Sequence, residues 1–337
     1  MTQLVPFQVF PPENRIIFSG ENTLKIQLSA FCNILLKMNM ERIPVILDGD
    51  PGADDSLGIL MALSSDRLEV LGITSVCGNT TSRQTAENAT KVCALAGRED
   101  IPVYCGANQP LNRELKFSTK YSGMDGLCDT GLAAKPEMIS ELSAKDFLIQ
   151  TLKHAEEPVT IIFTAGFTNL AEALKEEPEI RRGIKEVVAA SGYFGLNTKK
   201  VRAEWNILVD PEAAEIVYNS GIPVRSVGLD VTCMLEDSHV EQTLAKGSGA
   251  YCDFLKRCDA FNKKSNLHPY SLFVDGMAVA SAIRPELAEY TTGRAVVHPE
   301  KKDADLIEFI PGEGNIRAAH GFDFETYFEM IRGLITQ

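Results

Sequence analysis

The sequence predicts an α/β fold in which helices cover both faces of a mostly parallel sheet. From residue 43 onward, apolar β-type runs alternate with helical runs, which is the order that βαβ units produce. The β-type runs are continuously apolar, as in VTIIFT at 159–164, and this is typical of strands buried on both faces. Since no repeat or linker-like tract divides the chain, we expect a single domain with a Rossmann-like sheet that is mixed at its edge.

The first two thirds of the chain carry the regular part of this pattern. Each apolar run is predicted to be a strand, and the longer segment after it a helix. The strands are expected at residues 44–47, 70–76, 101–105, 159–164, 187–190 and 224–229. The helices are expected at 54–63, 82–95 (ended by Gly97), 144–155, 169–175 and 211–218, with a glycine-rich loop at 121–132. The last third is less regular, with helices expected at 250–261, 276–283 and 324–335 around a β-rich stretch at 293–319.

Residues 1–40 do not share this pattern. They contain Pro11-Pro12, charged residues and a short apolar piece at 28–36, but no basic start followed directly by an apolar core, so a signal peptide is not expected. We expect residues 1–40 to be a peripheral extension without chemistry and residues 41–337 to form the α/β domain. No apolar run reaches the roughly 18 residues that span a bilayer, so no membrane segment is predicted.

The net charge and the cysteine spacing argue against several classes of binding partner. The 33 basic and 46 acidic residues give a formal net charge of −13. This balance argues against binding to nucleic acid or to an anionic membrane, because both need a basic face. The eight cysteines form no CxxC pair and no zinc-type cluster with histidine. We therefore expect the cysteines to be small buried core residues. We also expect the protein to lie in a reducing, cytoplasmic compartment.

Four aspartates lie within eight residues between the first strand and the first helix, at Asp48, Asp50, Asp54 and Asp55. Ligands of open α/β sheets bind at the carboxyl ends of strands, so these side chains are expected to converge there. Helix capping explains one or two of them, but not four. Crowded carboxylates recruit a cation, and hard oxygen ligands suit Ca²⁺ or Mg²⁺. The spacing therefore predicts a metal site.

Other acidic and phosphate-binding loops fit this stretch less well. An EF-hand needs an acid or Asn at Gly52 and a glycine at Ala53, and a phosphate-cradling loop needs Lys-Ser/Thr, which is absent. A strand followed by Asp-x-Asp is also typical of Mg²⁺-dependent phosphohydrolases, in which Asp48 would be the nucleophile. That alternative stays open, although it gives Asp54 and Asp55 no role.

The run DGDPGADD at 48–55 resembles the signature of the calcium-dependent nucleoside hydrolases of the inosine–uridine-preferring type. Further similar motifs follow in order: VCGNTT at 76–81, IPVYCGA at 101–107, GMDGL at 123–127, TAGFTNL at 164–170, AEWNI at 203–207, DPEAA at 210–214 and VGLDVT at 227–232. Asp275 lies where the family has its last metal aspartate. The resemblance covers residues 43–334.

This resemblance implies a role for each matching residue. The ligands of Ca²⁺ would be the carboxylates of Asp50, Asp55 and Asp275 and the main-chain carbonyl of Thr164. Ribose would be bound by Asp54, Asn79, Glu204, Asn206 and Asp275, and Asp48 would support the metal loop from behind.

The implied reaction is hydrolysis of the N-glycosidic bond of ribonucleosides to ribose and free base, a step in nucleoside salvage. A Ca²⁺-bound water would be activated by Asp50, while the metal holds the ribose diol. An acidic pocket would stabilise the positive charge that develops on the sugar, and one-step attack would invert its anomeric centre. Besides the small-molecule nucleoside, the resemblance implies a homodimer or homotetramer as the assembly.

One position departs from the family pattern. Many members carry a histidine before the last aspartate, which helps the leaving base accept a proton, but here the residue is Val274. The candidates for a leaving-group or base pocket are His268, Tyr121 and Tyr270. Because of Val274, a catalytically weak ribose- or nucleoside-binding relative stays open as a second alternative.

Overall fold

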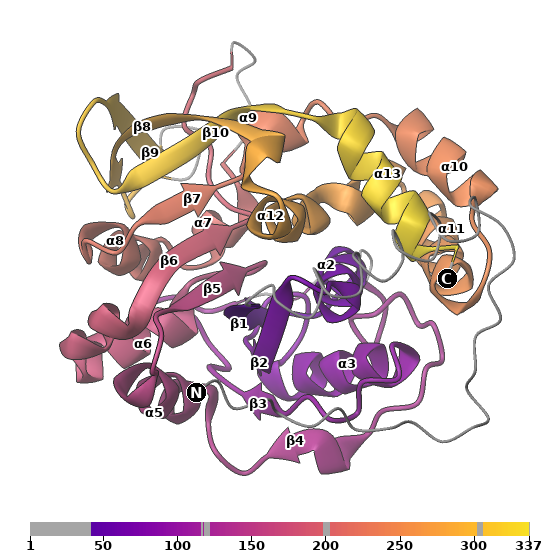
Figure 1. Cartoon of the computed structure of the whole chain (residues 1–337), viewed down its shortest axis with the longest axis horizontal. Coiled ribbons are helices and arrows are strands. Elements are labelled where there is room, and N and C mark those ends of the chain that lie inside the picture. The colour runs from indigo at the N-terminus through magenta and orange to yellow at the C-terminus, as the bar shows by residue number, and fades with distance from the viewer. Residues whose placement is uncertain (1–41, 116, 118–121, 198–202, 302–305, 337) are drawn as a thin grey trace, which may run out of the picture. The chain divides into compact units, whose positions relative to one another are not determined.

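Strand β1 (Ile43–Gly49) lies in the interior of the sheet, which extends on both sides of it. The structure is a computed structural model that describes residues 42–115, 117, 122–197, 203–301 and 306–336 (Figure 1). The extension expected at 1–40 and the candidate Tyr121 lie outside the described residues. Residues from Arg42 onward form one compact unit.

Among the described residues the sheet has ten strands, in the order β4-β3-β2-β1-β5-β6-β7-β10-β8-β9. Strands β1 to β7 run parallel to one another and β10 runs parallel to β7, whereas β8 is antiparallel to both β10 and β9. The other strands are β2 (Leu68–Ser75), β3 (Val103–Cys105), β4 (Ile139–Ser140), β5 (Val159–Phe163), β6 (Ile184–Ala189), β7 (Val224–Ser226), β8 (Ala288–Val297), β9 (Ile307–Pro311) and β10 (Ile316–Phe322). The predicted fold class, including the mixed edge, is confirmed.

The helices cover both faces of this sheet (Figure 1). They are α2 (Ala53–Ser64), α3 (Ser82–Leu95), α5 (Ala144–His154), α6 (Thr168–Glu176), α7 (Trp205–Val209), α8 (Pro211–Asn219), α9 (Leu229–Thr232), α10 (Asp237–Lys246), α11 (Ala250–Lys264), α12 (Val274–Ile283) and α13 (Phe324–Leu334). Short 3₁₀ turns lie at Pro136–Met138, Pro178–Gly183, Pro269–Phe273 and Pro285–Leu287.

Alternate residues of β1 pack into two separate cores. Val45 and Leu47 belong to the core shared with α2, α3, α11, α12 and α13, whereas Ile46 belongs to the core shared with α5, α6 and α8. Because successive strand side chains point to opposite faces, this division is what a strand covered on both sides requires. It explains why the strands are apolar throughout instead of alternating.

Local signals account for several helix ends. The Thr81 hydroxyl oxygen accepts a hydrogen bond from the Gln84 N–H and begins α3, and the Ser143 hydroxyl oxygen caps α5 in the same way. Gly97 has a φ of +65°, a left-handed conformation that ends α3 as predicted.

One predicted strand end was wrong. The strand expected at 224–229 ends at Ser226, because the apolar residues that follow form the short helix α9. An apolar run of this length does not distinguish a buried strand from a buried helical turn.

Candidate functional site

The carboxyl ends of β1, β2, β5 and β6 meet at one edge of the sheet, and the predicted site residues lie on the segments that leave this edge. Two small residues let the helices of the site approach closely. α2 packs against α12, and a Cβ at Gly58 would lie 3.1 Å from Val279 Cγ2, while one at Gly276 would lie 3.1 Å from Leu57 Cδ2. The first turns of these two helices are thereby brought together.

Asp54, Asp55 and Asp275 form an acidic cluster at this junction, with one carboxylate oxygen of each within 4.8 Å of the others. Asp55 and Asp275 are buried, and Asp54 is half-buried. Burial, and then the charge of Asp55, raises the pKa of Asp54 to about 7. Burial, and then the charges of Asp54 and Asp55, raises the pKa of Asp275 well above its usual value. Within the described part of the chain, no Lys or Arg forms an ion pair with these carboxylates.

Asp50 lies beside this cluster but is not one of the three grouped carboxylates. Its Oδ2 accepts a 2.6 Å hydrogen bond from the Asn79 N–H, and the Asn79 side-chain amide donates to the Asp50 carbonyl at 2.9 Å. A Cβ at Gly78 would lie 1.9 Å from Asp50 Oδ2, so only glycine fits there. Burial raises the pKa of Asp50 well above its usual value, and the charges of Asp55 and Asp54 raise it further.

Asp48 is fully buried behind this loop. Its Oδ2 accepts hydrogen bonds from the Thr74 hydroxyl at 2.5 Å and the Asn169 amide at 2.9 Å, while its Oδ1 has no partner among the described residues. Burial raises the pKa of Asp48 to about 7, although both hydrogen bonds lower it. Thr74 and Asn169 escaped the sequence prediction, because their side chains act across 26 and 121 residues of chain.

Thr164, which follows β5, contacts two of the predicted site residues. Its hydroxyl donates a 2.6 Å hydrogen bond to Asp55 Oδ1, and its carbonyl accepts one of 3.2 Å from the Asn206 side-chain amide. A Cβ at Gly49 would lie 2.4 Å from the Thr164 hydroxyl, so the absence of a side chain at Gly49 makes room for this contact. The carbonyl expected to ligate metal thus lies beside the acidic cluster.

Glu204 and Asn206 flank the start of α7. Glu204 caps this helix, because its carboxylate accepts hydrogen bonds from the N–H groups of Asn206 at 2.9 Å and Ile207 at 3.1 Å. Burial raises the pKa of Glu204, although these hydrogen bonds lower it, and its charge also acts on Asp275. Between them lies Trp205, the only tryptophan of the sequence, whose surface is 56% exposed.

Of the leaving-group candidates the structure describes His268 and Tyr270, and both make their hydrogen bonds to Asp237 rather than to the acidic cluster. The His268 side chain is 70% exposed, and its contacts within the described residues are an ion pair with Asp237 at 3.1 Å and stacking on Tyr270. The Tyr270 N–H also donates to Asp237. Val274 is the first residue of α12 and is half-buried.

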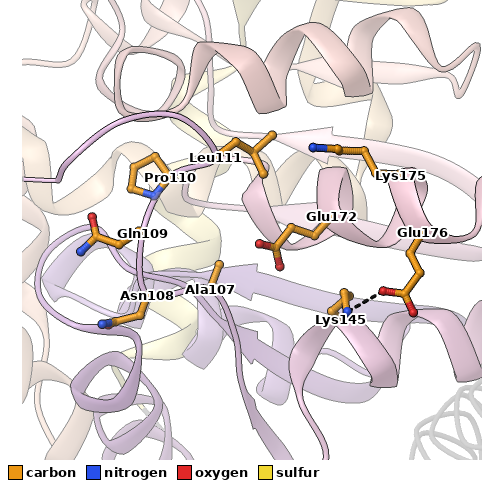
Figure 2. A pocket seen from close by; sticks show the side chains of 9 residues that line it. All are labelled: Ala107, Asn108, Gln109, Pro110, Leu111, Lys145, Glu172, Lys175 and Glu176. Carbon is orange, nitrogen blue, oxygen red and sulfur yellow. Dashed lines mark hydrogen bonds and ion pairs between the residues drawn. The ribbon is translucent and has the colours of Figure 1, made fainter.

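A cavity of about 760 Å³ lies between α5, α6 and the segment after β3 (Figure 2). Figure 2 shows the Glu172 carboxylate pointing into it, near the ion pair of Lys145 with Glu176. None of the predicted site residues lines it. Its charged and open lining lacks the convergent carboxylates found at the strand ends, so we place the functional site at the acidic cluster.

No helix in the described ranges is long and apolar enough to cross a membrane.

Comparisons with known proteins show which proteins this chain is similar to. Residues 45–329 match the family model described as inosine-uridine preferring nucleoside hydrolase. The pyrimidine-specific ribonucleoside hydrolase RihA of Escherichia coli O1:K1 is 43% identical over 201 residues, which is 60% of this chain. The match spans 64% of that relative, just under two thirds of its length.

Two solved structures share the fold over most of the chain. The plant nucleoside hydrolase PpNRh1 is 26% identical with a TM-score of 0.78, and it covers 88% of this chain and 99% of its own. The purine-preferring ribonucleoside hydrolase from Gardnerella vaginalis is 28% identical with a TM-score of 0.77, and the match covers 87% of this chain and 99% of that one.

Proposed function

We propose that this chain, which belongs to the inosine-uridine preferring nucleoside hydrolase family, hydrolyses the N-glycosidic bond of ribonucleosides to ribose and free base. The observation that carries this proposal is the buried cluster of Asp54, Asp55 and Asp275 beside Asp50, at the carboxyl edge of the parallel sheet. An acidic pocket at this edge suits a reaction in which positive charge develops on the substrate.

The donor set fits a hard divalent cation. It consists of carboxylate and carbonyl oxygens, and the cluster has no basic partner within the described residues. We propose Ca²⁺, held by Asp50, Asp55, Asp275 and the Thr164 carbonyl, because Ca²⁺ takes many oxygen ligands in flexible geometry. When bound, Ca²⁺ would supply positive charge that holds the ribose diol and makes nearby water more acidic.

Asp50 is the proposed general base. The Asn79 N–H holds one of its carboxylate oxygens, which fixes the orientation of the carboxylate. The carboxylate would accept a proton from the attacking water as the water's oxygen bonds to the anomeric carbon and the bond to the base breaks. Attack on the face opposite the base would invert that carbon.

The other polar residues would bind the sugar hydroxyls. The Asn206 amide nitrogen already donates to the carbonyls of Thr164 and Ala190, so its side-chain oxygen remains as an acceptor. Glu204 is held by main-chain N–H groups and can accept a hydrogen bond from another ribose hydroxyl. Asp54 and Asn79 complete the proposed ribose site.

The Val274 side chain has no acidic proton that it could donate to the leaving base. His268 is engaged with Asp237 and is largely exposed. We propose that the base leaves mainly through stabilisation of the ribosyl cation by the carboxylates, without an acid at position 274.

The phosphohydrolase alternative fits the structure poorly. It requires Asp48 as the nucleophile, but this side chain is fully buried and its Oδ2 accepts two hydrogen bonds. The acidic cluster in front of it would also repel a phosphate ester. A mere ribose-binding relative, in turn, would not need Asp50 beside the metal ligands.

The likeness to a pyrimidine-specific relative makes uridine and cytidine the first substrates to test. We also propose a cytoplasmic homodimer or homotetramer, and the buried thiols of Cys77, Cys93, Cys128, Cys252 and Cys258 are compatible with a reducing compartment.

The test is release of reducing sugar from uridine, cytidine, inosine, adenosine and guanosine by the wild type and by Asp50→Ala. Release by the wild type alone supports the proposal and assigns the base. If no nucleoside is cleaved while ribose still raises the Tm, the binding relative is the better description.

A further inference from the structure

The segment between β6 and α7 curls over one buried carboxylate. Asp230, on the short helix α9, is fully buried. Its Oδ2 accepts a hydrogen bond from the Phe194 N–H at 2.7 Å, and its Oδ1 accepts from Leu196 at 2.7 Å and Asn197 at 3.2 Å. The Asn197 side-chain amide also donates to the Asp230 carbonyl. Four hydrogen bonds thus anchor residues 194–197 to one residue of α9.

The start of the same segment contacts Glu204. The Gly192 N–H donates to Glu204 Oε2 at 2.9 Å, and the Gly192 carbonyl accepts from the Leu229 N–H at 2.8 Å. Gly192 has a φ of +84°, and a Cβ at Gly228 would lie 2.0 Å from its carbonyl oxygen. Gly192 is therefore fixed between α9 and the Glu204 carboxylate.

Three main-chain N–H groups donate to the Asp230 carboxylate, and such charge-assisted hydrogen bonds are among the strong ones in proteins. Without the carboxylate, these N–H groups would lose their partner in a buried place, and the segment would rearrange to reach water. Such a rearrangement would move Gly192 as well.

We propose that Asp230 is a positioning residue, which holds residues 192–197 so that the Gly192 N–H aims the Glu204 carboxylate at the ribose. This role rests on the proposed function, because Glu204 is a proposed ribose ligand. Asp230 itself touches no substrate. The arrangement makes ribose affinity depend on a carboxylate of α9 that acts through residues 192–197.

A double-mutant cycle with Glu204 tests this coupling. Asp230→Asn keeps one acceptor oxygen but removes the charge, and we expect it to lower kcat/KM by about 10-fold, mainly through a higher KM. In a Glu204→Gln background, the same substitution is expected to change kcat/KM by less than about 2-fold. An equal loss in both backgrounds would overturn the proposal.

A milder variant and a matched control guard against general unfolding. Asn197→Ala removes only the hydrogen bond from the Asn197 side-chain amide to the Asp230 carbonyl. We expect it to raise KM as well, but by less than Asp230→Asn does. Asp323→Asn makes the same chemical change at a carboxylate that caps α13 by accepting from the Thr326 N–H. It is expected to leave KM unchanged; a similar rise in KM would show that Asp230 acts only through stability.

Amide hydrogen exchange gives a readout that is independent of catalysis. Asp230→Asn is expected to raise exchange at residues 192–197, including Gly192, whereas Asp323→Asn is not. Unchanged protection would overturn the anchoring role whatever the activity. If protection falls but the wild type cleaves no nucleoside, the anchor stands and the proposed function fails.

Discussion

The Thr164 hydroxyl donates a 2.6 Å hydrogen bond to Asp55 Oδ1, joining the end of β5 to the first turn of α2 across 109 residues of chain. The bond orients the carboxylate of Asp55, a proposed metal ligand, and does not involve the Thr164 carbonyl oxygen, which is also a proposed metal ligand. The Asp55 carboxylate is thus oriented by this hydroxyl and by the Gly52 N–H, which donates to its Oδ2 at 3.0 Å.

Thr164→Val should weaken Ca²⁺ binding by about 10-fold, because it removes the hydroxyl that orients Asp55 while leaving the carbonyl and the volume of the side chain. Calorimetric titration with Ca²⁺ measures the change. Thr160→Val is the matched control, since its buried hydroxyl on the same strand has no hydrogen-bond partner within the described residues. An equal loss of affinity in both variants would rule out the specific bond as the cause.

Gly78→Ala should lower kcat by about 100-fold, because its Cβ would lie 1.9 Å from Asp50 Oδ2 and must displace the proposed base. Reducing-sugar release at saturating nucleoside measures this change. The control is Gly333→Ala on α13, where a Cβ meets nothing within 4 Å and should add about 0.5–1 kcal/mol of stability. Wild-type turnover in Gly78→Ala would show that Asp50 is not the base.

Removal of metal should destabilise the protein, because Asp54, Asp55 and Asp275 then repel one another without compensation. We expect Ca²⁺ at 100 times its Kd to stabilise the wild type by about 2.7 kcal/mol over a chelated sample. Asp275→Asn removes one like charge, so in chelator its Tm should exceed that of the wild type, while its response to Ca²⁺ should be lost. Thermal melts with EDTA, Ca²⁺ or Mg²⁺ check both parts, and an undiminished response of Asp275→Asn to Ca²⁺ would place the metal elsewhere.

Arg225→Met should cost about 1–3 kcal/mol of unfolding free energy, because it leaves the half-buried Glu186 carboxylate and the Ser281 carbonyl without their partner. Arg225 is buried and makes two 2.8 Å hydrogen bonds to the Glu186 carboxylate, with a third to the Ser281 carbonyl. Urea denaturation measures the loss. Arg83→Met breaks an exposed pair with Glu87 and should cost less than about 0.5 kcal/mol; similar costs for the two variants would contradict the buried-pair argument.

The sheet was predictable, and so was the gathering of acidic side chains at its carboxyl edge, because both rest on local patterns. Continuous apolar runs gave the buried parallel strands, and the aspartates after residue 47 lie at the strand ends that an α/β sheet brings together. The strand end at Ser226 was missed because an apolar run of that length does not reveal where a strand turns into a helix.

The contacts between individual side chains of the site were less predictable. The family resemblance implies Asp50, Asp55 and Asp275 as the metal-binding carboxylates. In the structure, Asp54 lies in the cluster with Asp55 and Asp275, and Asp50 accepts a hydrogen bond from the Asn79 N–H. Side-chain contacts such as that of Asn169 with Asp48 depend on packing between distant segments, which no local periodicity encodes. His268 likewise lies near α12 in sequence, yet its side chain is held by Asp237.

Trp205 gives the molecule a natural optical reporter. It is the sole source of indole fluorescence in the chain, is 56% exposed, and lies between Glu204 and Asn206. Because indole emission shifts to shorter wavelength and resists quenching when water leaves its surroundings, filling the ribose site should register directly in the emission spectrum. Occupancy by ribose or nucleoside could then be followed in real time, without a label and without turnover.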